Sequence, residues 1–153
     1  MSENPVVLVT RKLPDAVEQR LSRNYEAPLN PDDRQYSSNQ EIELASGADG
    51  NVPCHTERFA AAVTERLPAT VKVIANFSVG VDHVDLAAAK ARGIIVTNTP
   101  DVLSDATAEV TMLLILGAAR RAGEGEHLVR TREWRDWSPS FMVGTQVTGK
   151  RLG

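Results

Sequence analysis

Short apolar runs alternate with amphipathic segments along the first hundred residues or so, and this alternation constrains the fold more than any other feature. Strands that alternate with helices form a parallel sheet with right-handed crossovers and helices on both faces. The sequence therefore predicts an α/β domain whose ligands collect beyond the carboxyl ends of the strands. The expected strands are 5–10, 25–33, 49–56, 71–76 and 94–98, and the expected helices are 13–24, 37–47, 56–68 and 85–93.

Two of the five expected strands are weak. Pro28 and Pro31 interrupt the run that follows the first helix, because proline cannot donate to a sheet ladder. Asn51 and Pro53 are poor strand residues at the place where the third strand is due. The helix after that strand is expected to begin at Thr56, whose hydroxyl is a plausible N-cap.

A different pattern begins after Asn98. Residues 99–131 form one long helical candidate, N-capped by Ser104 or Asp105, whose apolar side chains cover more than one face. A helix of this kind needs partners on several sides. The glycines in the sequence "AGEGEH" offer breaks near its carboxyl end.

The segment that follows, 132–153, is irregular and rich in aromatic residues. It has no visible local core to bury them, so we expect an interface with another chain rather than a core patch. The residues concerned are Trp134, Trp137 and Phe141.

Composition excludes several classes of partner. A net charge of −3 and the absence of a basic stripe argue against nucleic acid and against an anionic membrane surface. The start "MSENPVVLVT" lacks the basic residues of a secretory signal, and no apolar run reaches membrane-spanning length. The single cysteine, Cys54, excludes an internal disulfide framework and is typical of a reducing compartment. We expect a cytoplasmic protein.

The most informative stretch is "ANFSVGVDHVD", residues 75–85. One interpretation is a simple turn between a strand and a helix, with Asp82 and Asp85 as capping residues. The other is an anion cradle made of main-chain N–H groups, in which Gly80 permits a positive φ and a close approach of the ligand. The residues alone leave both interpretations open.

Metal binding and nucleophilic catalysis are weaker hypotheses. "DHVD" contains metal-ligating residue types, but no third histidine or cysteine stands at a recognisable spacing, so no metal site is predicted. Cys54 and His83 could form a nucleophile and base pair. A buried structural cysteine is the preferred interpretation.

Three motifs together resemble the D-2-hydroxyacid dehydrogenase family, and within it the glyoxylate/hydroxypyruvate reductase branch. They are "FSVGVDHVDLAAAKARGIIVTNTPDVLSDATAEVTMLLILGAARR", "EWRDWSP" and "VTGKRLG". The resemblance implies a flavodoxin-like substrate domain at 1–98, an interdomain and dimer helix at 99–125, and a dimerisation arm at 126–153. It also implies that the arm leads into a truncated Rossmann NAD-binding domain.

The resemblance further implies a set of binding residues. Ser78, Val79 and Gly80 are expected to bind the substrate carboxylate through main-chain N–H groups, with a further substrate contact near Cys54. Thr107 is expected to approach the nicotinamide end of NAD or NADP. In a homodimer, Trp137 is expected to reach toward the active site of the partner.

The same resemblance sets limits. The family's catalytic arginine, glutamate and histidine lie beyond its G-x-G-x-x-G loop, which is expected to follow Gly153, so no catalytic residue is predicted in this chain. We therefore expect a fragment that is inactive alone, from an enzyme that transfers hydride from NAD(P)H to a 2-oxo acid such as glyoxylate or hydroxypyruvate. The alternatives are an NAD(H)-sensing corepressor-like binding protein, an inactive dimerisation fragment, and a relative of formate or phosphite dehydrogenases.

Overall fold

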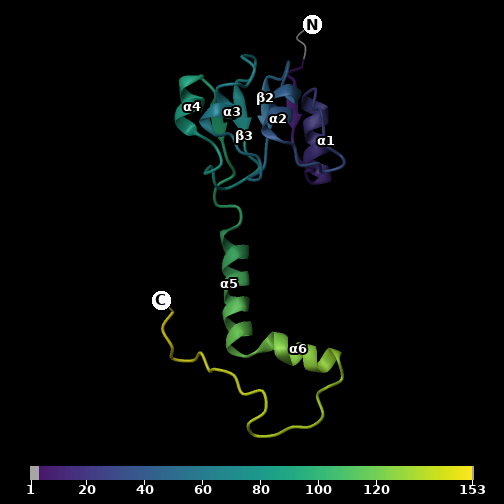
Figure 1. Ribbon diagram of the computed structural model, residues 1–153, viewed down its shortest axis with the longest axis vertical. Coiled ribbons are helices and arrows are strands. Elements are labelled where there is room, and N and C mark those ends of the chain that lie inside the picture. Colours follow the sequence, from purple (N-terminus) through teal and green to yellow (C-terminus); the bar gives the residue numbers. More distant parts are fainter. Residues whose placement is uncertain (1–3, 153) are drawn as a thin grey trace. The chain divides into compact units, whose positions relative to one another are not determined.

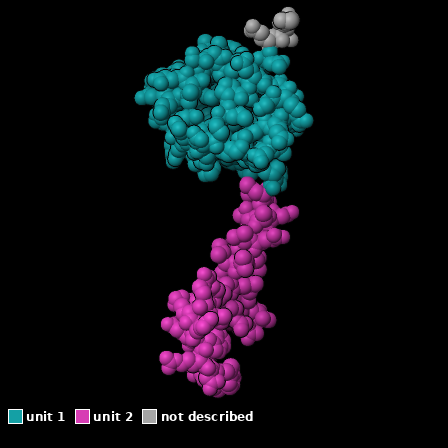
Figure 2. Space-filling model, turned by 90° about the vertical axis from the view of Figure 1, so that its right-hand side faces the viewer, with its two compact units in different colours: residues 1–102 teal, residues 103–153 magenta. Residues whose placement is uncertain are grey.

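A computed structural model describes residues 4–152 and divides the chain into two compact units (Figures 1 and 2). The first unit comprises residues 1–102 and the second comprises residues 103–153. The finer three-part division expected from the sequence stays a prediction. No helix in the described part of the chain is long and apolar enough to cross a membrane.

The first unit contains a parallel sheet with strand order β1-β2-β3-β4, which confirms the predicted α/β class. The strands are β1 Val7–Val9, β2 Gly50–Val52, β3 Val73–Ala75 and β4 Ile95–Thr97. The fifth strand expected at 25–33 is wrong, since only Glu26 forms a bridge there, to Val6. Pro28 has no N–H with which to continue the ladder. Counted with this bridged segment, the order is the flavodoxin-like 2-1-3-4-5.

Four helices connect the strands, and Figure 1 shows α1 and α4 at opposite ends of the unit. They are α1 Asp15–Asn24, α2 Ser38–Leu44, α3 Ala61–Thr64 and α4 Leu86–Ala91. α2 begins with a capping box between Ser37 and Gln40. α4 begins at the predicted cap, because the Asp85 carboxylate accepts a hydrogen bond from Ala88 N at 2.9 Å.

The helix expected over 56–68 is much shorter than predicted, and Thr56 is not its N-cap. Phe59 is held extended by a parallel bridge to Val84, in which Phe59 N donates to His83 O and Asp85 N donates to Phe59 O, both at 2.8 Å. This long-range pairing keeps residues 56–60 out of the helix. α3 therefore begins only after Ala60, which makes no side-chain cap.

The hydrophobic core lies on one face of the sheet. Leu8, Asn51, Ile74 and Val96 are register partners across the four strands, so their side chains point to the same face. α2, α3, α4 and their flanking residues cover this face and bury Ala45, Phe59, Leu67 and Ala89. α1 lies on the other face, where its Leu21 lines a hollow with Val7, Val52 and Val73. Helices on both faces were predicted, and Asn51 forms part of β2 in spite of its low strand propensity.

The second unit contains two helices where one long helix was expected. They are α5 Ser104–Ala119 and α6 Ala122–Arg130. Arg121 causes the break by adopting a left-handed conformation at φ 55°, and neither glycine of "AGEGEH" does so. The predicted N-caps are also wrong, because the helix begins one residue after Leu103, which makes no side-chain cap.

The arm after α6 is irregular, as predicted, and returns to the end of α5. Thr145 N donates to Ala119 O at 2.7 Å, which satisfies one of the last carbonyl groups of α5. Gly144 allows this approach, because a Cβ atom there would lie 2.5 Å from Ala119 O. Trp134 and Phe141 pack edge to face with ring centroids 5.4 Å apart, so they contact each other within the arm.

Candidate functional site

The loop after β3 is fixed by the loops that follow both neighbouring strands. On the β2 side, Phe77 N donates to Pro53 O at 2.8 Å. On the β4 side, Thr99 N donates to Ser78 O at 2.9 Å and Asn98 Nδ2 donates to Val79 O at 2.7 Å. The loop is therefore hydrogen-bonded to a neighbouring loop on each side.

These bonds use the carbonyl groups of the loop and leave its N–H groups free. Ser78 Oγ also donates to Gly80 O at 3.0 Å, and Val84 N donates to Val81 O at 2.9 Å. Among residues 4–152, the N–H groups from Ser78 to His83 donate to no acceptor. Consecutive N–H groups without internal partners are donors available to an anion.

The loop borders a hollow of about 250 Å³ at the carboxyl edge of the sheet. Ser78, Gly80, Asp82 and His83 come from the loop after β3, and two basic side chains come from the loop after β2. β2 and β3 are neighbours, so their carboxyl ends bring these two loops together. The two basic side chains are His55 and Arg58.

A buried carboxylate holds the loop that carries these basic residues. The side chain of Glu57 is fully buried and accepts hydrogen bonds from Cys54 N at 2.7 Å and from Thr56 Oγ1 at 2.6 Å. It also accepts from Thr10 Oγ1 at 3.1 Å, which ties the loop to the end of β1. With Phe59 bridged to Val84, the loop is fixed on both sides of Arg58.

A cation lies on the outer side of this network. Arg11 Nη1 is 3.7 Å from Glu57 Oε1, and Arg11 Nε donates to Asp33 Oδ1 at 2.8 Å. The hydrogen bond from Arg11 lowers the pKa of Asp33 to about 2. Arg11 is therefore paired twice and contributes to the structure of the edge.

Cys54 has the environment of a structural cysteine. It is half-buried, and burial raises the pKa of its thiol, with the negative charge of Glu57 as the second cause. A thiol with a raised pKa is a poor nucleophile at neutral pH. His83 Nε2 forms its hydrogen bond with Asn76 Oδ1 at 2.8 Å, so the described residues contain no bonded Cys54–His83 pair.

The structure brings together only part of the predicted site. Ser78 and Gly80 line the hollow, Val79 lies half-buried between them, and Cys54 is outside its lining. Thr107 and Trp137 belong to the second unit, where both are exposed. The binding roles of all these residues stay predictions.

Two details of the predicted loop are corrected. Gly80 does not adopt a positive φ, and the described glycines that do are Gly47, Gly93 and Gly149. Gly80 instead leaves the main chain open to a ligand. The space around it is open, because a Cβ atom at this position would meet only Asp82 Oδ2, at 3.2 Å. Asp82 does not cap α4, since Asp85 alone occupies that position.

Sequence reasoning missed Asn76, Glu57 and Arg58. Asn76 is 3% exposed and ends the run of β3, so a polar residue at the end of a buried strand was the available signal. Glu57 and Arg58 carried no such signal, because they were expected in a helix.

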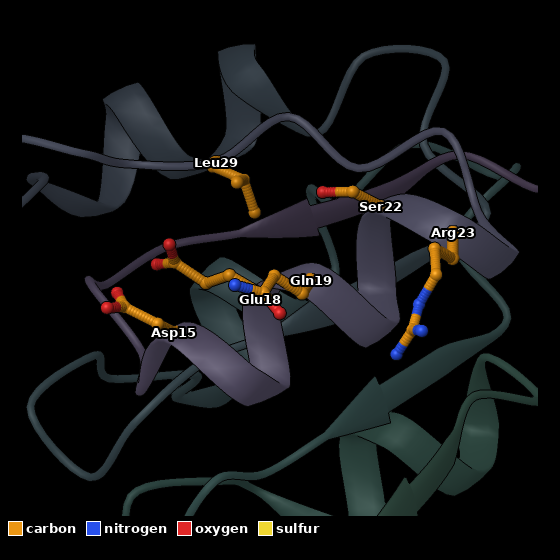
Figure 3. Close-up of a pocket in the computed structure, with 6 residues that line it drawn as sticks. All are labelled: Asp15, Glu18, Gln19, Ser22, Arg23 and Leu29. Carbon is orange, nitrogen blue, oxygen red and sulfur yellow. The ribbon is translucent and has the colours of Figure 1, made fainter.

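A second hollow, of about 480 Å³, lies along α1 (Figure 3). Leu29 faces the helix across it. Its buried carboxylate, Glu18, already accepts from Leu13 N at 2.9 Å and pairs with Lys12, so it offers no free group to a ligand. Among residues 4–152 no group of three or more His, Cys, Asp or Glu side chains could hold a metal ion.

Fold and site together define an α/β domain whose sheet carries, at its carboxyl edge, a loop with N–H donors that no described residue occupies. The chain belongs to the D-isomer specific 2-hydroxyacid dehydrogenase family, because the sequence profile of that family's catalytic domain matches residues 7–148. It is 42% identical over 147 residues to a glycerate dehydrogenase from Hyphomicrobium methylovorum, a match that covers 96% of this chain and 46% of the relative. It is 35% identical to a glyoxylate reductase from Thermococcus kodakarensis, over 97% of this chain and 46% of the relative.

Solved structures give the same family. A Polaromonas protein described as a D-isomer specific 2-hydroxyacid dehydrogenase, NAD-binding, superposes with a TM-score of 0.87 at 39% identity. That similarity covers 98% of this chain and 47% of the other. An NADPH-dependent glyoxylate/hydroxypyruvate reductase from Sinorhizobium meliloti, in complex with NADP and malonate, superposes with a TM-score of 0.71 at 27% identity. That similarity covers 90% of this chain and 43% of the other. The chain spans about half the length of the curated relatives it matches.

Proposed function

We propose that the Ser78–His83 loop binds the carboxylate of a small 2-oxo or 2-hydroxy acid. The observation that carries this proposal is the run of consecutive N–H groups that donate to no acceptor among the described residues, in a loop where every carbonyl oxygen except that of Asp82 accepts a hydrogen bond. A carboxylate only accepts hydrogen bonds, so it matches donors of this kind. Arg58 adds a positive charge to the same hollow.

The whole protein is proposed to be a D-2-hydroxyacid dehydrogenase that reduces a 2-oxo acid such as glyoxylate or hydroxypyruvate. Relatives named glycerate dehydrogenase and glyoxylate reductase support this activity. The part of this chain is to hold the carboxylate and so orient the carbonyl carbon for reaction. None of its residues is assigned a proton-transfer step. A cytoplasmic location is also proposed, and its support is the free, half-buried Cys54.

NAD(P) is the cofactor of this family, and it supplies the hydride. Residues 4–152 do not form a dinucleotide cradle by themselves. The nearest sequence to G-x-G-x-x-G is "GEGEHL", which has Leu128 in place of the third glycine and lies inside α6. Thr107, exposed in the first turns of α5, is proposed to approach the nicotinamide end, and no cofactor-dependent step is assigned to it.

A binding titration of this chain tests the carboxylate role. Glyoxylate is added to ¹⁵N-labelled protein, and glycolaldehyde serves as the matched ligand without a carboxylate. We expect glyoxylate to shift the amide resonances of Ser78–His83 and glycolaldehyde to leave them in place. Equal shifts with both ligands, or glyoxylate shifts confined to other residues, would show that the loop does not bind the carboxylate.

A paired substitution sharpens this test. Gly80→Val introduces a side chain over the N–H groups and should abolish the glyoxylate shifts, whereas Ala87→Val, on the exposed surface of α4, should not. In a longer protein that contains this chain, Gly80→Val should raise KM for the 2-oxo acid far more than it alters cofactor affinity. An equal effect on cofactor affinity with unchanged KM contradicts the proposal.

We also propose that the whole protein is a homodimer in which α5 lies at the interface. No residue of α5 is buried, and Val110, Leu113 and Leu114 are all more than half exposed. Apolar surface of this extent favours a protein partner. Sedimentation equilibrium of the whole protein should give a dimer. Leu113→Asp should dissociate this dimer, whereas Arg20→Asp, a change on the exposed surface of α1, should not. A monomer at all concentrations would exclude this interface.

A further inference from the structure

The orientation of the buried Asn76 amide is fixed by its neighbours. Asn76 N and Asn76 Nδ2 both donate to Thr97 O at 2.9 Å. A carbonyl oxygen only accepts hydrogen bonds, so the side-chain atom facing it must be the NH₂ group. The other side-chain atom, Oδ1, is therefore an acceptor.

This orientation determines the tautomer of His83. Its Nε2 lies 2.8 Å from Asn76 Oδ1, and two acceptors cannot share a hydrogen bond, so Nε2 carries the proton. Burial lowers the pKa of His83, and the nearby His55 lowers it further. Both effects favour the neutral ring, in which Nδ1 is an acceptor, and Nδ1 makes no hydrogen bond within residues 4–152.

We propose that His83 is a specificity-determining residue, whose Nδ1 accepts a hydrogen bond from the 3-hydroxyl group of a 3-hydroxy-2-oxo acid. The inference rests on the proposed function, because His83 and the carboxylate-binding loop line the same hollow. The substrate class it names is 2-oxo acids with a hydroxyl group on the third carbon. It separates hydroxypyruvate from pyruvate and glyoxylate, which have no such group.

The other groups in the hollow make this division of roles chemically reasonable. The free N–H groups of the loop and the guanidinium of Arg58 are donors only, and they match the carboxylate and oxo oxygens. A substrate hydroxyl must also place its own proton on an acceptor. Asp82 and His55 also line the hollow and are exposed, whereas the imidazole of His83 is fixed through Asn76 in one tautomer.

Asn76 is a positioning residue in this scheme. It contacts no substrate, but its Oδ1 keeps the proton of His83 on Nε2 and so leaves the lone pair on Nδ1. A merely structural hydrogen bond from His83 to Asn76 would fix the same tautomer. The tautomer is therefore a requirement of the proposal, and contact of a ligand at Nδ1 is the observation that distinguishes the two roles.

The experiment compares hydroxypyruvate with pyruvate, which differ by one hydroxyl group, as ligands of ¹⁵N-labelled wild-type chain and of His83→Phe. Amide shifts of Ser78–Gly80 give both dissociation constants, and the imidazole ¹⁵N shifts give the tautomer and report contact at Nδ1. We expect wild type to prefer hydroxypyruvate by about three- to tenfold, the value of one hydrogen bond. We expect His83→Phe to bind both acids with the affinity that wild type has for pyruvate.

The outcomes separate this inference from the function on which it rests. If neither acid shifts the loop amides, the carboxylate role and the hydroxyl contact are both overturned. If both acids bind wild type equally, or if free His83 carries its proton on Nδ1, only the hydroxyl contact is overturned. The wild-type comparison and the tautomer need no variant, so misfolding of His83→Phe would not protect the proposal.

Discussion

Glu41 gives the sharpest prediction about stability. It lies in α2, is 1% exposed, and its Oε2 has no hydrogen-bond partner among the described residues. Burial raises the pKa of this carboxyl from 4.5 to about 7, and the negative charge of Glu57 adds to the rise. The folded protein therefore holds this proton more tightly than the unfolded chain does.

The direction and size of the effect follow from this difference. A carboxyl group with a raised pKa in the folded state destabilises the fold when it ionises. The penalty is absent below about pH 4.5, grows as the pH rises toward 7, and is constant above that. The pKa difference limits this destabilisation to roughly 3 kcal/mol. Leaving one acceptor buried and unpaired costs about 1–3 kcal/mol.

The substitution that isolates the charge is Glu41→Gln, because the amide has the shape of the protonated acid and does not ionise. Urea unfolding followed by circular dichroism measures the free energy of unfolding at each pH. At pH 8 we expect the free energy of unfolding of Glu41→Gln to be about 1–3 kcal/mol higher than that of wild type. At pH 4 we expect the two free energies to be nearly equal. Glu43→Gln, on the exposed side of the same helix, should show no such pH-dependent gap.

A gap between wild type and Glu41→Gln that stays the same from pH 4 to pH 8 would refute the argument. It would mean that Glu41 titrates alike in the folded and unfolded chain. The burial of its carboxylate would then have to be compensated by a partner, contrary to the unpaired Oε2.

Two further predictions concern single contacts. Asp85→Ala removes the cap of α4 and should lower the free energy of unfolding by about 0.5–2 kcal/mol, whereas Asp82→Ala should change it little; equal losses in urea unfolding would contradict the cap assignment. Gly144→Ala places a Cβ atom 2.5 Å from a backbone oxygen of α5 and should detach the arm, seen as faster hydrogen exchange at Thr145 N. Gly123→Ala, with open space around its Cβ, should leave that exchange unchanged, and equal exchange in both variants would show that Gly144 is not needed for the contact.

Local patterns predicted the elements that local interactions specify. β1 and β3 are continuous apolar runs and β4 begins with one, while α4 is flanked in sequence by its cap, Asp85, and by Gly93. α3 was predicted too long because a bridge between Phe59 and Val84, distant in sequence, overrides the helical pattern before it. The break after α5 was assigned to glycines, although Arg121 makes it by adopting a conformation that pattern alone does not show.

The candidate site divides in the same way. The loop of residues 75–85 could be predicted because its small and polar residues follow directly after an apolar run. The tautomer of His83 could not, because it depends on Asn76 and, through it, on a carbonyl group of β4. Arg58 could not be placed either, since its position depends on the buried carboxylate next to it.

The run of N–H donors that the loop offers to a ligand depends on strand order. β3 lies between β2 and β4, so the loop that follows it has a neighbouring loop on each side. Asn98 and Thr99 on one side, and Phe59 on the other, donate to carbonyl oxygens of the loop and turn those acceptors away from a ligand. A loop at the edge of a sheet would have a neighbour on one side only and would keep part of its carbonyl groups free. The donors that remain after this pairing are the basis of the proposed carboxylate binding, and His83 lies beside them as an acceptor fixed through Asn76.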